Sequence, residues 1–111
     1  MNHELDALIA APQHHKLLFE NDMVRVLDAN IPAGEKTNLH EHRHSASLYF
    51  ISWSDFIRYD ADGNVIFDSR SLEKIPLQGT ATWTGPMAAH ALENVGANSL
   101  HVICVEIKTK K

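Results

Sequence analysis

The chain has 111 residues, a length typical of one domain. Its 44% hydrophobic and 22% charged residues are the balance of a globular protein and exclude global disorder. Fourteen acidic against ten basic residues give a net charge of -4, which argues against nucleic-acid binding. No apolar run approaches the roughly 18 residues of a membrane span, and residues 1–11 lack the basic start of a signal peptide. Because Cys104 is the single cysteine, no intrachain disulfide can form, and we expect a cytoplasmic protein without membrane contact.

Short apolar segments separated by turn residues follow one another along the chain. One or two helical turns are predicted within residues 3–11, ended by Pro12. Residues 60–64 contain Asp-Gly, which is typical of a hairpin turn. The other segments are strand-like, and their spacing of roughly eight to twelve residues indicates an all-β sandwich or barrel of about nine short strands. The predicted strands are residues 16–20, 24–31, 48–52, 56–59, 65–67, 72–75, 81–84, 91–94 and 100–107.

Histidine is the residue type that stands out, with eight in the chain. His40, His42 and His44 alternate in sequence, so in a strand their imidazoles would share one face. Neutral imidazoles that converge can hold a divalent transition metal, and His90 is the candidate ligand from a distant strand. His44 is either a fourth ligand, an acid–base group or, in the interpretation we favour, a histidine at the rim or surface. A solvent-exposed edge without metal is the alternative interpretation of all three alternating histidines.

The remaining polar candidates have plainer interpretations. His14 and His15 are expected to be solvated, and His101 to be an ordinary strand residue. Cys104 lies between apolar neighbours and is expected to be buried and unreactive. Glu106 is expected to be an outward carboxylate without a paired partner. The residues expected either to line a pocket or to be plain core are Tyr49, Phe50, Trp83 and Met87.

The spacing around these histidines resembles the two sequence motifs of the cupins. Five residues separate Gly34 from His40, and His42 follows, as in the glycine and His-x-His of the first cupin motif. Three residues separate His90 from Asn94, as at the end of the second motif. The resemblance covers roughly residues 17–108. It implies a single cupin domain over residues 1–111, with an antiparallel, jelly-roll-like β-barrel.

The sequence also departs from the cupin motifs. The metal-binding glutamate of the first motif falls at Ala46 or Ser47, neither of which is a carboxylate, and Ala88 replaces a glycine of the second motif. Some cupin oxygenases, such as those resembling thiol dioxygenases and diketone-cleaving dioxygenases, use three histidines and no glutamate. The resemblance therefore implies a divalent transition metal (Fe, Ni, Mn or Zn) whose ligands are His40, His42 and His90.

Three functions are compatible with this sequence. The first is a small metal-dependent enzyme, of dioxygenase type, that acts on a small organic molecule at a three-histidine site. The second is a barrel that binds or senses a small ligand without converting it. The third is a degenerate, metal-free barrel. A homodimer is expected, since the chain is short, similar cupins dimerise and residues 16–20 could pair across an interface.

Overall fold

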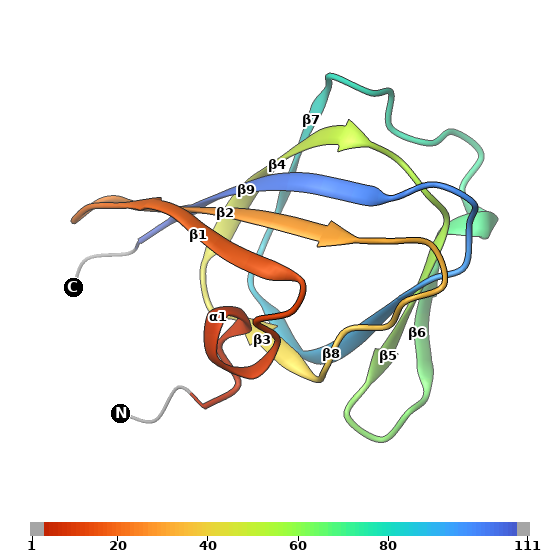
Figure 1. Ribbon diagram of the computed structural model, residues 1–111, viewed down its shortest axis with the longest axis horizontal. Coiled ribbons are helices and arrows are strands. Elements are labelled where there is room, and N and C mark those ends of the chain that lie inside the picture. The colour runs from red at the N-terminus through yellow and green to blue at the C-terminus, as the bar shows by residue number, and fades with distance from the viewer. Residues whose placement is uncertain (1–3, 109–111) are drawn as a thin grey trace.

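The computed structural model describes residues 4–108 and is built almost entirely of antiparallel strands (Figure 1). A one-turn helix precedes the first strand, and a short 3-10 helix follows the sixth. This confirms the predicted all-β class with nine short strands in the described part of the chain. The elements are α1 (Ala7–Ala10), β1 (His15–Glu20), β2 (Val24–Ile31), β3 (His40–His42), β4 (Ser45–Ser52), β5 (Phe56–Asp60), β6 (Val65–Asp68), η1 (Ser69–Ser71), β7 (Ala81–Thr84), β8 (Met87–Asn94) and β9 (Leu100–Ile107).

The strands form two sheets that face each other across the core. One sheet has the order β1-β2-β9-β4-β7, and the other has the order β3-β8-β5-β6. In Figure 1 the five-stranded sheet arches over the four-stranded sheet. The hydrogen bonding does not continue around a closed barrel, so the architecture is jelly-roll-like with two open sheets.

Alternation along the strands decides which side chains enter the space between the sheets. In β9, Leu100, Val102 and Cys104 are buried, whereas the residues between them are partly exposed. In β2 the same period buries Leu27 and Ala29. Because successive side chains of a strand point to opposite faces, the core is a strip of every second residue.

One predicted strand is absent from the structure, and the predicted helical turn is present. The strand predicted at residues 72–75 is wrong: this segment is part of the connection that runs from η1 to β7. The connection passes from β6 of the four-stranded sheet to β7 of the five-stranded sheet, and it belongs to neither sheet (Figure 1). The prediction of one or two helical turns within residues 3–11 is confirmed by the single turn of α1, and His3 lies outside the described residues. No helix between residues 4 and 108 is long and apolar enough to cross a membrane.

The glycine and asparagine of the cupin-like motifs meet at one corner of the fold. The N–H of Gly34 donates to the carbonyl of Asn94 (3.1 Å), and the φ of Gly34 is 82°, a left-handed value that favours glycine. The buried amide of Asn94 donates to the carbonyls of Ile31 (2.7 Å) and Asn98 (2.8 Å) and accepts from Ser54 Oγ (2.7 Å). All of these partners are structural, so Asn94 holds three segments together and takes no part in the site.

Candidate metal centre

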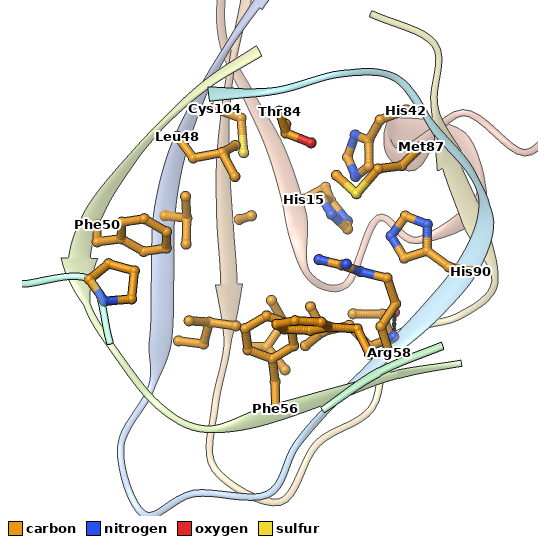
Figure 2. A pocket seen from close by; sticks show the side chains of 18 of the residues that line it. His15, His42, Leu48, Phe50, Phe56, Arg58, Thr84, Met87, His90 and Cys104 are labelled. Carbon is orange, nitrogen blue, oxygen red and sulfur yellow. Dashed lines mark hydrogen bonds between the residues drawn. The ribbon is translucent and has the colours of Figure 1, made fainter. Parts of the chain in front are cut away.

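Four histidine side chains from three strands converge at one end of the space between the sheets. They are His15 from β1, His40 and His42 from β3, and His90 from β8. The ring centre of His40 lies 4.5 Å from that of His15, 5.0 Å from that of His42 and 4.5 Å from that of His90. One ring nitrogen from each of His15, His40 and His42 lies within 4.8 Å of the others. Figure 2 shows His15, His42 and His90 turned toward one another.

Strand pairing brings these residues together from distant parts of the chain. His40 in β3 is directly opposite His90 in β8, so both side chains stand on the inner face of the four-stranded sheet. His15 is the first residue of β1, an edge strand of the other sheet, and approaches from the side of α1. The site therefore depends on strands from both sheets and on the segment that leads from α1 into β1.

Main-chain carbonyls orient three of the four imidazoles. A carbonyl oxygen can only accept, so each of these rings carries its proton on Nδ1 and leaves Nε2 as an unprotonated acceptor. This is the arrangement in which metal-binding histidines are usually held. The three Nδ1 contacts are His15 to Ala11 O (3.0 Å), His40 to Asn38 O (2.8 Å) and His90 to Ala88 O (2.8 Å).

A buried carboxylate orients the fourth imidazole. His42 Nδ1 lies 3.1 Å from Glu106 Oε2, and Arg25 Nε donates to the other oxygen of the same carboxylate (3.0 Å). Arg25 continues to Asp6, with 2.9 Å between Nη2 and Oδ1. Burial works to raise the pKa of Glu106, but the hydrogen bond from His42 and the charge of Arg25 outweigh it and hold this pKa below its ordinary value. Glu106 therefore stays ionised and accepts the Nδ1 proton of His42.

Burial keeps the imidazoles without charge. It lowers the pKa of His15 to about 4, of His40 to about 2 and of His90 to about 4, and the neighbouring rings reinforce this effect. At neutral pH these histidines are therefore neutral, as metal ligands must be. Within residues 4–108 no hydrogen bond occupies the Nε2 atoms of His15, His40, His42 or His90. A set of neutral nitrogen acceptors with no donor to satisfy it fits a divalent transition metal such as iron, nickel, manganese or zinc.

The structure differs from the sequence-based expectations at several residues. The ring centre of His90 lies 4.5 Å from that of His40 and 5.7 Å from that of His42. The three histidines whose ring nitrogens lie within 4.8 Å of one another are His15, His40 and His42, so the ligand set of His40, His42 and His90 stays a prediction. The expectation that His15 is solvated is wrong, because its side chain is buried against His40. His14 is not solvated either: it is largely buried, and its Nε2 lies 2.8 Å from Glu35 Oε1. His44 is partly exposed and does not line the cavity, since β3 ends at His42 and the alternation stops there.

Glu106 is the second misjudged residue of the site. It was expected to point outward, yet it is 1% exposed. The alternation of β9 contained the information, since Glu106 shares its face with Cys104, which was expected to be buried. Cys104 itself agrees with expectation, because burial raises the pKa of its thiol to about 12 and leaves it unreactive.

A cavity of about 460 Å³ extends from the histidine cluster into the apolar core. Its size is that of a small-molecule site. Phe50, Trp83 and Met87 line it, whereas Tyr49 is 45% exposed and does not. No aspartate or glutamate stands among the described residues that line the cavity. Among the described lining residues Arg58 is the one lysine, arginine, aspartate or glutamate, and sequence reasoning did not single it out.

Comparison with known proteins identifies the fold. No protein-family model matches this chain. A cupin domain from Bordetella pertussis Tohama I superposes with a TM-score of 0.67 at 17% identity, over 86% of this chain and 92% of that one. A cupin-family protein with a double-stranded β-helix fold from Methanocaldococcus jannaschii gives 0.58 at 14% identity, over 84% and 77%. The chain therefore has the cupin fold, as the resemblance of its motifs implies.

A curated relative adds sequence similarity without a known activity. An uncharacterised protein of Methanocaldococcus jannaschii is 26% identical over 90 residues, which are 81% of this chain. The chain spans 65% of that relative's length. The fold is thus established by structural similarity, and the function has to be argued from the site.

Proposed function

We propose that this protein is a metal-dependent cupin enzyme of oxygenase type, which acts on a small organic molecule in the cavity next to His15, His40, His42 and His90. One observation carries the proposal. The four Nδ1 atoms are engaged by three carbonyls and one carboxylate, so the four Nε2 atoms remain available for a cation. His15 adds a nitrogen donor in a chain that has Ala46 and Ser47 where the first cupin motif has its glutamate.

The donor set suits anionic substrates. A divalent metal held only by neutral imidazoles keeps its full positive charge and, when bound, would attract an enolate, thiolate or carboxylate and supply a site for oxygen activation. The protein itself contributes orientation, because each ring is fixed by its Nδ1 partner. It also excludes water, because the rest of the cavity wall is mostly apolar.

Metal content tests the proposal. Protein purified without a polyhistidine tag and analysed by plasma mass spectrometry should hold about one equivalent of a divalent transition metal. His40→Ala should lose it, since His40 touches the three other rings. His44→Ala is the matched control and should retain it, because His44 lies outside the cavity lining. Less than about a tenth of an equivalent after reconstitution would contradict the proposal.

Turnover separates the enzyme from the ligand-binding alternative. Oxygen consumption that depends on a metal and on a small organic substrate, and that is lost in His40→Ala, would support an oxygenase. Ligand-dependent stabilisation of the metal-loaded protein with no product formed would favour a sensing role instead.

Dimerisation remains a proposal as well, and β1 supports it. This edge strand exposes Leu17 (41%), Leu18 (48%) and Phe19 (54%), and an apolar sheet edge is a natural pairing surface. Light scattering at micromolar concentration should give a dimer, and Phe19→Lys should give a monomer with unchanged metal content. A monomer in the unmodified protein would contradict this proposal.

A cytoplasmic location is proposed from the cysteine usage. Cys104 is free and buried, which suits a reducing compartment but does not require one. Cell fractionation with an antibody against the protein would test the location.

A further inference from the structure

Arg58 places a cationic side chain inside the cavity, next to the histidine cluster. In the pairing of β5 with β8, Arg58 is opposite Leu92 and Asp60 is opposite His90. Arg58 is therefore two pairs removed from His90, on the same inner face of the sheet. Figure 2 shows the Arg58 side chain reaching into the cavity toward His15 and His90.

No protein group neutralises this guanidinium. Its Nε is buried and makes no hydrogen bond, and within residues 4–108 Arg58 forms no ion pair. Its charged end lies 5.5 Å from the ring centres of Phe56 and Phe67, which are its cation–π neighbours. Burial lowers the pKa of Arg58, but a guanidinium stays charged in proteins.

Arg25, which is buried, shows how this fold treats such a charge. Arg25 is neutralised by two carboxylates, with 2.9 Å to Asp6 and 3.0 Å to Glu106. The cavity around Arg58 has no carboxylate among its described lining residues, although the chain as a whole has a net charge of -4. A guanidinium withdrawn from water without a counter-ion is costly, so a missing anion is the simplest account of Arg58.

We propose that Arg58 binds the carboxylate of the substrate, and that the substrate class is small monocarboxylic acids with an apolar body. The planar guanidinium would donate two parallel hydrogen bonds to the oxygens of a carboxylate. The body of the acid would lie against the apolar wall formed by side chains such as Phe50, Phe56 and Leu100. The end of the acid that would react would face the histidines, and this part of the inference rests on the proposed function. The contact between Arg58 and the carboxylate requires only the cavity.

Paired acids and amides test the inference, since each pair has nearly the same shape and differs in charge. The probes are phenylacetate, 3-phenylpropionate and hexanoate, each with its amide, titrated calorimetrically into zinc-treated and chelator-treated protein. At least one acid should bind the unmodified protein at least about tenfold more tightly than its amide, with or without zinc. Arg58→Met, which keeps an unbranched apolar stem but removes the guanidinium, should remove this preference. Arg70→Met is the control and should keep it, because Arg70 pairs with Asp68 outside the cavity lining.

The outcomes separate this inference from the proposed function. No preference for the acid in any pair, or the same preference in Arg58→Met, would overturn the role of Arg58. A preference that needs zinc and ignores Arg58 would also overturn it, while leaving the metal centre intact. Protein that binds no metal but shows an Arg58-dependent preference would sustain the carboxylate site and refute the metal-dependent enzyme.

Discussion

The two ends of the cavity are built on different physical principles. At one end His15, His40, His42 and His90 are held by hydrogen bonds to carbonyls and to Glu106. At the other end Trp53 packs between Phe50 and Phe56, with 5.6 Å between ring centres in each pair. Figure 2 shows the labelled histidines at one side of the cavity and the two phenylalanines away from them.

The two ends of the cavity depend on different properties of their side chains. The imidazoles of the polar end keep their orientation only if every ring keeps its Nδ1 partner, because an unsupported imidazole is free to turn. The apolar end depends on filled volume and tolerates changes of shape that conserve it. Loss of charge should therefore damage the histidine end, and loss of volume should damage the aromatic end.

Acid should produce the largest effect, and between about pH 6.5 and pH 4 the buried histidines are its main target. Because the pKa values of His15 and His90 are about 4 in the folded protein and about 6.5 in an unfolded chain, the unfolded state takes up protons first as pH falls. Stability of the metal-free protein should be level above about pH 6.5 and then fall by about 1.4 kcal/mol per pH unit for each histidine, down to about pH 4. Urea unfolding between pH 8 and pH 4 measures this. His15→Gln should reduce the slope, and a level profile across the window would contradict the assignment of neutral buried histidines.

Glu106→Gln should have the next largest effect. It removes the charge that Arg25 and His42 share, so we expect a loss of about 3 kcal/mol in the free energy of unfolding. Metal affinity should fall by about 10- to 100-fold, because His42 loses its carboxylate partner. Denaturant unfolding and metal titration give the two values.

Asp28→Asn is the control for that change. Asp28 pairs with His101 on the partly exposed face of the neighbouring strands, at 2.8 Å. Its loss should cost no more than about 1 kcal/mol and leave metal affinity unchanged. Equal effects of the two substitutions would mean that Glu106 has no special place in the centre.

Phe56→Leu should have the smallest effect and should act at the aromatic end. It removes part of a buried ring from the cavity wall, so we expect a loss of about 1–2 kcal/mol in stability. Metal stoichiometry should not change, since Phe56 is not among the ring contacts of the histidine cluster. A loss of metal in this variant would show that the two ends are coupled.

Much of the fold follows from local patterns. The strands Val24–Ile31, Ala81–Thr84 and Leu100–Ile107 have the predicted bounds, because each is an apolar or β-branched run between turn residues. The segment 72–75, with Leu72 and Ile75 around two charged residues, is also predicted as a strand but has no partner strand, and it is a loop. Composition therefore indicates where strands form, and pairing decides which of them exist.

The sequence by itself determined the all-β class, the two cupin-like motifs and the pairing of His40 and His42 with His90 as candidates for one site. Only the tertiary structure decided that His15 joins them, that Glu106 lies behind His42 and that Arg58 stands in the cavity without a counter-ion. The physical reason is range. Alternation and turn chemistry act between neighbouring residues, whereas these three side chains owe their surroundings to strands that meet from distant parts of the chain.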